Sequence, residues 1–230
     1  MDQGRQGRQH QAGVNAQNAY EAARRVVSDN DTLTLSQADF ERFIAACENP
    51  PEPTEALRKL MALRRMVVRI EPLAARHQRA GFDCGEPALN DFLQRQAGQM
   101  ERRGFAKTYV ALALDGILVV GFVTLSAGQV ESQKFPSHLK LPRYPAPTLR
   151  IDRLAVDRQQ QGLDIGQHLM SFALQLALEF SLQVGLYAVV VDAKNQRVKE
   201  FYEALGFVAT VDDSLCLYLP MGTLAKLNSG

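Results

Sequence analysis

The stretch QQQGLDIG, which runs from Gln159 to Gly166, has the residue types of a turn that binds an anion. An apolar run ends just before it at Val156, and a long amphipathic run begins within it at Ile165. The first N–H groups of a helix are unpaired and carry a partial positive charge, so a phosphate placed there accepts several hydrogen bonds. Glycines such as Gly162 and Gly166 allow the backbone to approach it closely. Two glycines also occur in many plain connections, so the turn alone does not identify a site.

An aspartate, Asp164, stands inside this turn and can act in two ways. A carboxylate about 6 Å from a pyrophosphate raises the energy by ~3 kcal/mol per charge pair at an effective dielectric of about 20, which weakens binding about a hundredfold. Alternatively, Asp164 caps the helix and forms a capping box with Gln167, which stabilises the helix by about 1 kcal/mol. Its carboxylate then occupies the N–H groups that a phosphate needs. Both interpretations predict weaker binding of an anion than glycine would permit.

Two further elements can complete a site around the turn. The strand before it ends with Leu154, Ala155 and Val156, and unpaired backbone groups there can bind an extended ligand as another strand would. Tyr202 lies in an amphipathic run, NQRVKEFYEALG. A phenol with a pKa of about 10 can protonate a leaving group. The alternative for Tyr202 is a half-buried aromatic side chain with no chemical role.

Residues 66–230 have the pattern of an α/β (α+β) domain with a mixed, mostly antiparallel central sheet flanked by helices. We expect strands at 66–73, 107–114, 117–128, 148–156, 186–193, 207–210 and 216–221. We expect helices at 86–103, 165–180 and 195–206, the first with Leu89, Phe92, Leu93 and Gln96 on one side. Asp115 and Gly116 predict a hairpin turn between two strands, and Gly206 predicts the end of the last helix.

The first 65 residues divide into a tail, 1–17, and a helical segment, 18–65. The tail is rich in Gln, Gly and Arg, which predicts disorder. In the helical segment TLTL looks extended, and Ser36 begins a helix with Asp39 in a weak capping-box arrangement. The apolar face of that helix comprises Phe40, Phe43, Ile44 and Cys47.

Prolines Pro50, Pro51 and Pro53 end this helix, and Thr54 caps a last one. The apolar stripe of the last helix comprises Leu57, Leu60 and Met61. Two short stripes make a marginal core, so the segment needs a surface to lie on. It either wraps over the following domain as over a partner or simply completes that domain's core.

The composition excludes several classes of protein. The chain has 230 residues, 46% of them hydrophobic, and a net charge of +1, so a surface for nucleic acid must be a local patch. Cys47, Cys84 and Cys216 have no metal-ligand spacing and are expected to be reduced thiols. No run is long enough to span a membrane and no secretory signal is present. We expect a cytoplasmic protein without a metal.

Five phrases, in order, resemble the toxin–antitoxin branch of the GNAT acetyltransferases. They are FDCGEPALNDFL, GFVTLSAG, LPRYPAPTLRIDRLAVDRQQQG, VVVDAKN and FYEALGF with LPM, and they cover most of 66–225. The resemblance implies a GNAT fold and transfer of acetyl from acetyl-CoA to the amino group of aminoacyl-tRNA, which blocks translation. It also implies a homodimer.

The preceding stretch LTLSQADFERFIAACENPPEPTEALRKLM resembles the C-terminal part of the partner antitoxin, of the DUF1778, ribbon-helix-helix type. That antitoxin is normally a separate chain, so the resemblance implies a toxin neutralised by a fused segment, in cis or on a second protomer. No alternating strand of the DNA-binding kind precedes AYEAARRVV. We therefore do not expect this chain to bind operator DNA by itself.

The resemblance also implies roles for individual residues. The acetyl-CoA loop of the family reads Gln/Arg-x-x-Gly-x-Gly/Ala; Gln159 and Gly162 match its first two fixed positions, and Asp164 stands where its final Gly or Ala is expected. The implied cofactor-binding residues are Leu154, Ala155, Val156, Gln159, Gly162, Leu163, Asp164, Ile165, Gly166, Asn195 and Phe201. Tyr202 matches the catalytic tyrosine that faces the CoA sulfur, and a backbone N–H near Leu154 to Val156 would steady the oxyanion.

The acceptor side is less defined by the sequence. Candidates for a basic rim that binds tRNA phosphates are Lys107, Lys140, Arg143, Arg150 and Arg153. Tyr109, Ser126 and Arg153 are candidates for lining the acceptor site. Asp152, Asp157 and Asp192 are candidates for a general base by composition only, and a water chain is the alternative.

Three functions remain open at this stage. The first is a toxin acetyltransferase held in check by its own segment. The second is a degenerate GNAT that acts as a regulatory or binding module because Asp164 weakens cofactor binding. The third is a GNAT that acetylates a protein or a small-molecule amine, with the N-terminal segment completing the fold.

Overall fold

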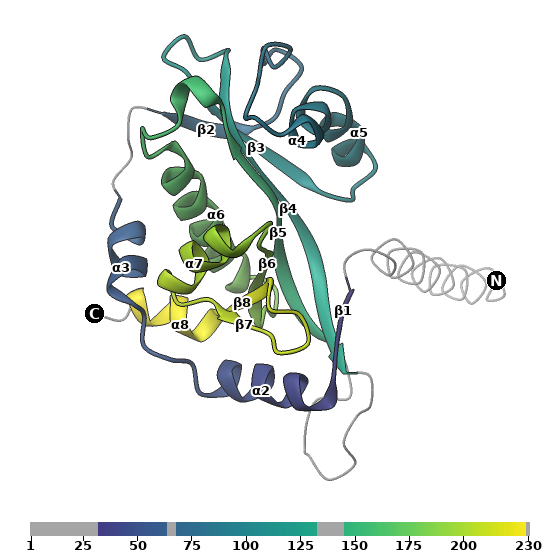
Figure 1. Ribbon diagram of the computed structural model, residues 1–230, viewed down its shortest axis with the longest axis vertical. Coiled ribbons are helices and arrows are strands. Elements are labelled where there is room, and N and C mark those ends of the chain that lie inside the picture. The colour runs from purple at the N-terminus through teal and green to yellow at the C-terminus, as the bar shows by residue number, and fades with distance from the viewer. Residues whose placement is uncertain (1–31, 64–67, 133–144, 229–230) are drawn as a thin grey trace, which may run out of the picture.

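The computed structural model describes residues 32–63, 68–132 and 145–228, and it contains one mixed sheet with helices on both faces (Figure 1). The strand order is β2-β3-β4-β5-β6-β8-β7, and β1 also pairs with β4. The pairs β1–β4 and β5–β6 are parallel, and the other pairs are antiparallel. The prediction of a mixed, mostly antiparallel sheet is confirmed.

The strands are shorter than their apolar runs at several ends. They are β1 (Thr32–Leu35), β2 (Arg69–Pro72), β3 (Lys107–Leu112), β4 (Val119–Ser132), β5 (Ala146–Val156), β6 (Ala188–Asp192), β7 (Val208–Ala209) and β8 (Cys216–Pro220). The hairpin between β3 and β4 turns at Asp115 and Gly116 as predicted, and Gly116 has a φ of +70°. Asp115 accepts the N–H groups of Ile117 and Leu118, so β4 begins only after them.

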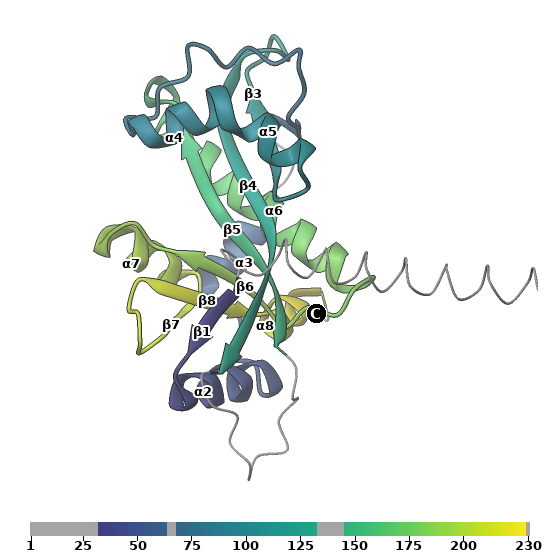
Figure 2. The same cartoon turned by 90° about the vertical axis from the view of Figure 1, so that its right-hand side faces the viewer.

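The helices cover the two faces of the sheet unequally. They are α2 (Gln37–Glu48), α3 (Glu55–Met61), α4 (Pro87–Asp91), the π-helix η1 (Phe92–Gln96), α5 (Ala97–Arg102), the 3-10 helix η2 (Arg158–Gln160), α6 (Ile165–Ser181), α7 (Gln196–Ala204), α8 (Met221–Ala225) and the 3-10 helix η3 (Lys226–Asn228). One face carries α3, α6, α7 and α8 (Figure 1). On the other face α4, η1 and α5 cover one half, and α2 lies across the opposite end (Figure 2).

The long helix α6 packs on the centre of the sheet through a stripe of apolar residues. Its members recur at intervals of three and four, as a helix buried on one side requires. The buried members are Ile165, Leu169, Met170, Ala173, Leu174 and Ala177. They share one core with Val123, Leu125 and Ile151 of the sheet. This packing fixes the start of α6, and therefore the turn before it, next to the end of β5.

The predicted helix 86–103 is interrupted, and this corrects one residue assignment. Residues Phe92–Gln96 form a π-helix between α4 and α5. In a π-helix each residue rotates less about the helix axis than in an α-helix. The buried face that follows is therefore displaced by one residue along the chain. Ala97 is therefore buried where Gln96 was expected, and the Gln96 amide instead donates to the Asp91 carboxylate at 2.8 Å.

The start of α2 differs from the predicted capping box. Ser36 caps the helix as predicted, since its Oγ accepts the Asp39 N–H at 3.3 Å. The Asp39 carboxylate does not return to Ser36. It accepts the N–H groups of Val211 and Asp212, both at 2.6 Å, and Asp39 is buried. In turn, the Ser36 N–H donates to the Asp212 carboxylate at 2.5 Å. The helix start is thus tied to the loop between β7 and β8.

Residues 32–63 share the core of the domain that follows them. Phe40 and Phe43 of α2 are fully buried, and Phe43 meets Tyr218 of β8 edge-on at 4.9 Å between ring centroids. Leu57 of α3 is fully buried in the core around α6. Thr54 caps α3 as predicted and also donates to the Ala204 carbonyl at 2.9 Å. The predicted tail, 1–17, and residues 18–31 lie outside the described residues.

Candidate functional site

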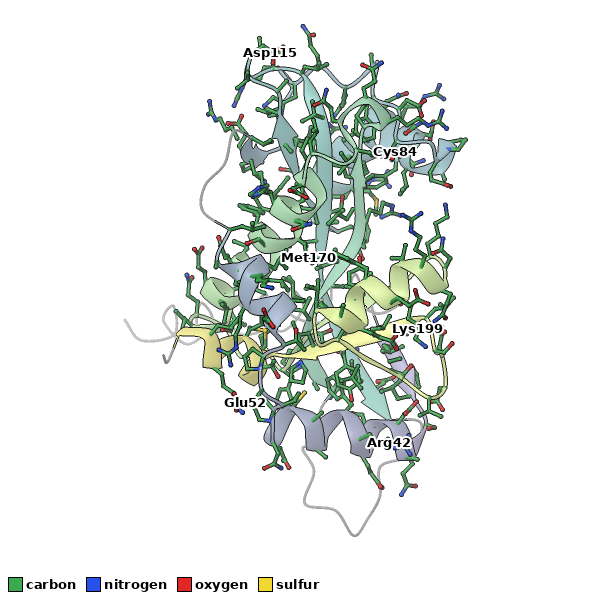
Figure 3. All side chains as sticks on the ribbon, turned by 60° about the vertical axis from the view of Figure 1, so that its left-hand side comes forward. Arg42, Glu52, Cys84, Asp115, Met170 and Lys199 are labelled. Atoms are coloured by element: carbon green, nitrogen blue, oxygen red, sulfur yellow. The ribbon has the colours of Figure 1, made fainter. Side chains whose placement is uncertain are left out.

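A cavity of about 700 Å³ lies where β5, the turn before α6, and α7 meet. Its walls contain Leu154 and Val156 of β5 and Phe201 and Tyr202 of α7. The turn and the first helical residues contribute Gly162, Asp164, Ile165 and Gly166. Met170 of α6 lies in the same wall, and Figure 3 shows it near the middle of the molecule. The size suits a small organic ligand.

The end of β5 has a free edge toward this cavity. The pairing of β5 with β6 ends at Ile151 with Val191, whereas β5 continues to Val156. On its other side β5 pairs with β4 as far as Val156 and Gly121. The two parallel strands therefore separate after Ile151, and the edge that β6 leaves is where an extended ligand can bind the backbone.

The structure corrects the predicted capping role of Asp164. Asp164 occupies the position before α6 in a left-handed conformation, with φ 56° and ψ 8°, and its side chain caps no N–H group. Instead the Gln167 side-chain amide donates to the Asp164 Oδ1 at 3.1 Å. The first N–H groups of α6 are thus not occupied by the aspartate. A non-glycine residue in this conformation costs about 1 kcal/mol.

Tyr202 has a buried ring and an accessible hydroxyl. Its ring lies 5.4 Å from that of Phe201 and 5.3 Å from that of Phe207. In the described residues every buried side-chain oxygen or nitrogen has a hydrogen-bond partner. The Tyr202 hydroxyl has none among these residues, so it is not buried and faces the cavity that Tyr202 lines. Burial, and secondly the negative charge of Asp192, raise the pKa of Tyr202 to about 12. The phenol is therefore protonated at neutral pH and can donate a proton.

Asn195 lines the cavity, but its side chain caps α7. The Asn195 Oδ1 accepts the Val198 N–H at 3.0 Å, which satisfies one of the free donors at the helix start. Its amide nitrogen is the group that stays available to a ligand. Asn195 was predicted from the sequence only as a cofactor-binding residue. The structure adds a second role, the cap of α7.

Three of the predicted cofactor-binding residues lie outside the cavity. Ala155 is buried on the opposite face of the sheet, because alternate residues of a strand point to opposite sides. Gln159 lies in a small depression beside Phe82. Leu163 is 59% exposed and lines a separate apolar depression with Leu114.

The sequence analysis missed an ion pair at the cavity. Glu86, just before α4, pairs with Lys194, which follows β6, and both side chains line the cavity together with Arg197. The KNQR stretch after the strand is the signal that could have identified the two basic residues.

The rest of the cavity wall is formed by Gln160, Gln161, Gln167 and Val198. The Gln161 amide donates to the Val156 carbonyl at 3.0 Å, so one acceptor of the free β5 edge is already bonded.

The three described residues of the predicted basic rim for tRNA all contact other side chains of the protein. Lys107 pairs with Glu101, and Arg150 pairs with Asp192 and, at 3.5 Å, with Asp152. The Arg153 guanidinium lies 4.0 Å from the centroid of the Phe92 ring. Lys140 and Arg143 lie outside the described residues.

The candidates for a general base do not lie together. Asp152 and Asp192 lie near Ser126, a candidate for lining the acceptor site, whereas Asp157 lies elsewhere. The Ser126 hydroxyl donates to Asp152 at 3.1 Å, and these residues lie beside Arg150 and Asp192. Asp157 instead caps η2 and accepts the Asp83 N–H at 3.0 Å, which is a structural role.

Tyr109 and the three cysteines have defined surroundings in the structure. Tyr109 packs on Phe172 of α6 at 4.9 Å between ring centroids, so it lies on the α6 face and away from Ser126. Cys47, Cys84 and Cys216 are free thiols. In the part of the chain that the structure describes, no cluster of side chains could hold a metal ion and no helix could cross a membrane.

The donor set of the cavity suits a thioester carried by a phosphorylated, extended cofactor. The free β5 edge can bind an amide-containing arm, and the uncapped start of α6 can bind phosphate. A β-carbon at Gly162, which has a φ of +83°, would meet no atom within 4 Å, so the approach to the turn is open. Lys194 and Arg197 add positive charge to the wall, and the carboxylates of Asp164 and of Glu86, the partner of Lys194, oppose it.

Comparison with known proteins gives two family matches. Residues 72–207 match the acetyltransferase (GNAT) family, and residues 16–66 match the antitoxin TacA 1-like family. The chain is 34% identical over 142 residues to a tRNA-acetylating toxin of Mycobacterium tuberculosis (strain ATCC 25618 / H37Rv), covering 61% of this chain and 84% of the relative.

Two solved structures are similar to the whole domain. AtaT complexed with acetyl-methionyl-tRNAfMet has a TM-score of 0.63 and 30% identity, covering 70% of this chain and 99% of the other. A mutant AtaT toxin bound to the C-terminus of the antitoxin AtaR and acetyl-CoA has a TM-score of 0.62 and 27% identity, covering 72% of this chain and all of the other.

Proposed function

Since the chain belongs to the GNAT acetyltransferase family, we propose that it is an acetyl-CoA-dependent N-acetyltransferase of the toxin type. It transfers acetyl to the amino group of aminoacyl-tRNA and thereby inhibits translation. The observation that carries the proposal is the cavity in which the free β5 edge, the uncapped start of α6 and the Tyr202 hydroxyl meet. Relatives named for tRNA acetylation and solved with an acetylated aminoacyl-tRNA support the choice of acceptor.

The residues of the cavity divide the chemistry between them. Acetyl-CoA supplies an acetyl thioester, whose carbonyl an amine attacks and whose sulfur leaves as a thiolate. Tyr202 donates its phenolic proton to the sulfur, and the amine proton restores the phenol, so the net transfer is from nitrogen to sulfur. A phenol with a pKa of about 12 holds its proton until negative charge has developed on the sulfur. A backbone N–H of the free β5 edge stabilises the oxyanion.

We propose that Leu154, Val156, Gly162, Ile165, Gly166, Asn195 and Phe201 bind acetyl-CoA. Arg197 joins this set, because its charge favours the CoA phosphates, whereas the charge of Lys194 is paired with Glu86. The three predicted residues outside the cavity, Ala155, Gln159 and Leu163, are not part of this set.

The N-terminal segment is proposed to act as a built-in antitoxin. Residues 32–63 are held by buried phenylalanines, by the Asp39 carboxylate and by the pairing of β1 with β4. In the described part of this segment no residue lines the cavity, which leaves room for acetyl-CoA while the segment is docked. We further propose that the protein is a cytoplasmic homodimer in which the segment restrains the toxin domain in cis, and that the chain alone does not bind operator DNA.

An assay of acetyl transfer tests this function. The full chain is incubated with labelled acetyl-CoA and a pool of aminoacylated tRNA, and label in the RNA is counted before and after mild base, which releases the aminoacyl group. Base-labile label that requires Tyr202 supports the proposal. Label on added proteins or polyamines, with none on aminoacyl-tRNA, would favour a GNAT that acetylates a protein or a small-molecule amine.

One observation favours a second function, that of a degenerate GNAT acting as a regulatory or binding module. Asp164 places a carboxylate in the wall where phosphate is expected. Calorimetry with acetyl-CoA separates the two functions. Tight binding by the wild type excludes the degenerate module, whereas binding that appears only in Asp164→Gly supports it.

A further inference from the structure

Two arginines of the described chain carry no ion pair and lie close to each other. Within residues 32–63, 68–132 and 145–228, the salt bridges include Lys107 and Arg150 but neither Arg79 nor Arg102. Arg95, one turn from Gly98 along the same helical stretch, is paired with Asp91 at 3.3 Å. Arg103 and Arg153 are likewise absent from the ion pairs of the described residues, but Arg79 and Arg102 are the two whose guanidinium groups lie against one glycine.

The two guanidinium groups converge over Gly98 of α5. Arg102 Nη1 lies 3.5 Å from the position that a β-carbon would take at Gly98, and Arg79 Nη2 and Nη1 lie 3.8 and 3.9 Å from it. Arg79 thus turns both terminal nitrogens toward one point, which is the arrangement that binds two oxygens of one anion. The missing side chain of Gly98 keeps the point open.

Like charges held together without a counterion repel each other, and the arrangement is stabilised when an anion lies between them. Guanidinium forks match phosphate better than point charges do, because they donate in a plane to two oxygens. Arg102 is exposed and Arg79 is half-buried, so a polymer can reach the pair. The site therefore has the chemistry of a phosphate clamp.

The position of the clamp indicates a long ligand. Glu86 lies in the cavity wall directly before α4, and α4, η1 and α5 form one continuous helical stretch from there to Gly98. Twelve residues of helix span roughly 18 Å. A nucleic acid strand advances about 3.4 Å per nucleotide, so the clamp lies about five nucleotides from Glu86 in the cavity wall. A small amine or a single amino acid cannot contact both places.

We propose that Arg79 and Arg102 form a clamp over Gly98 that binds a backbone phosphate of the acceptor RNA. The inference rests on the proposed aminoacyl-tRNA acceptor and names a contact of that acceptor remote from the chemistry. It adds two guanidinium groups without an ion pair to the predicted basic rim, in which Lys107 and Arg150 are paired with carboxylates.

Two variants of the full chain test the clamp by different routes. Arg79→Gln combined with Arg102→Gln removes both charges. Gly98→Asp keeps both arginines and places a carboxylate between them, which competes with phosphate inside the protein; aspartate is also no worse than glycine in a helix, so stability should hold. Arg42→Gln is the matched control, since Arg42 is exposed on α2 at the distant end of the molecule (Figure 3).

Binding of aminoacyl-tRNA is measured by fluorescence anisotropy over a range of salt concentrations. The double variant and Gly98→Asp should raise Kd at least about tenfold, as expected for lost hydrogen bonds to a charged group. They should also reduce the slope of log K against log salt by about one unit. Acetylation of an aminoacyl-adenosine, which is too short to reach the clamp, should be the same in all variants. Arg42→Gln should bind tRNA as the wild type does.

The outcomes separate the clamp from the proposed function. If both variants bind tRNA with the affinity and salt slope of the wild type while acetyl transfer is intact, the clamp is wrong and the function stands. If the wild type transfers no acetyl to aminoacyl-tRNA but its RNA binding depends on Arg79 and Arg102, the clamp stands and the function is wrong.

Discussion

At the scale of single residues, Tyr202 combines a packed ring with a hydroxyl that is open to the cavity. The aromatic contacts hold the ring, so the hydroxyl keeps a fixed position relative to the free edge of β5. Burial raises its pKa to about 12, which preserves the proton for transfer at any physiological pH. The chemistry can therefore be removed without disturbing the packing.

Tyr202→Phe should lower kcat by about 10²- to 10⁴-fold, the usual contribution of a positioned proton donor. Phenylalanine keeps the ring contacts with Phe201 and Phe207, so Tm and the Kd of acetyl-CoA should be unchanged. Steady-state kinetics, calorimetry and thermal unfolding check the three quantities. An unchanged kcat would show that Tyr202 is only part of the core.

Asp164→Gly should tighten acetyl-CoA binding by up to about a hundredfold, because it removes a carboxylate from the cavity wall. Stability should change by less than about 1 kcal/mol, since relief of the left-handed strain is offset by the greater entropy of unfolded glycine. Isothermal calorimetry measures the affinity. The control Gln167→Ala removes a neutral side chain of the cavity wall together with its hydrogen bond to Asp164, and keeps the aspartate charge. Equal affinity in wild type and Asp164→Gly would contradict this view of the turn.

At the scale of elements, Glu71 of β2 links the strand to the loop that follows it. Its carboxylate accepts from His77 Nε2 at 2.9 Å and pairs with Arg69 and Arg76. Partial burial raises the pKa of Glu71, but the hydrogen bond from His77 and the charges of Arg69 and Arg76 outweigh it, so the pKa is lowered overall. A lowered pKa in the folded state means that ionised Glu71 stabilises the fold.

Glu71→Gln should therefore destabilise the protein at neutral pH and have little effect in acid. The contribution of Glu71 is present above the unfolded-state pKa of about 4.3 and is lost as pH falls through the lower pKa of the folded state. Urea unfolding of wild type and variant from pH 7 down to pH 3 measures the difference in the free energy of unfolding. A difference that stays constant over this range would contradict the assignment.

Sequence patterns predicted the elements best where one period continued without interruption. The 3.6-residue stripe of α6 and the apolar runs of the central strands placed the β5–α6 turn correctly, and with it Gly162, Ile165 and Gly166 at the cavity. The π-helix was not predicted, because its wider turn depends on the fit of Leu93 and Ala97 to the sheet.

Local sequence patterns could not predict contacts between residues that are far apart in the chain. Asp39 looks like a local cap, yet its carboxylate bonds the backbone 172 and 173 residues away. Asp164 also has the sequence of a cap, but the left-handed turn directs its side chain elsewhere. The basic residues expected to bind RNA were chosen by type, and only the folded chain shows that Lys107 and Arg150 already have carboxylate partners.

At the scale of the whole molecule, the N-terminal segment is joined to the last helices through close contacts. A β-carbon at Gly222 of α8 would lie 2.5 Å from Pro50 Cγ. Thr223 donates to the Pro51 carbonyl at 3.1 Å, and Lys226 donates to the Pro50 carbonyl at 2.8 Å. The connection between α2 and α3 is therefore seated in a notch that exists only because residue 222 has no side chain.

Gly222→Ala should push this connection out of its notch and destabilise the protein by about 1–3 kcal/mol, as overpacking does. If the segment restrains the toxin domain, acetyl transfer per folded molecule should rise. Gly185→Ala is the matched control, because a β-carbon there meets no atom within 4 Å. Denaturant unfolding and transfer assays on both variants measure the effects. Reduced stability without any rise in transfer would mean that the segment only completes the core.

The central claim is transfer of acetyl from acetyl-CoA to the amino group of aminoacyl-tRNA, and mass spectrometry tests it most directly. The full chain is incubated with both substrates, the RNA is digested with nuclease, and the aminoacyl-adenosine fragment is weighed. We predict an added acetyl group on the amino acid with the wild-type chain and with Gly222→Ala, and almost none with Tyr202→Phe. An unmodified fragment in every sample, at saturating acetyl-CoA, would contradict the account.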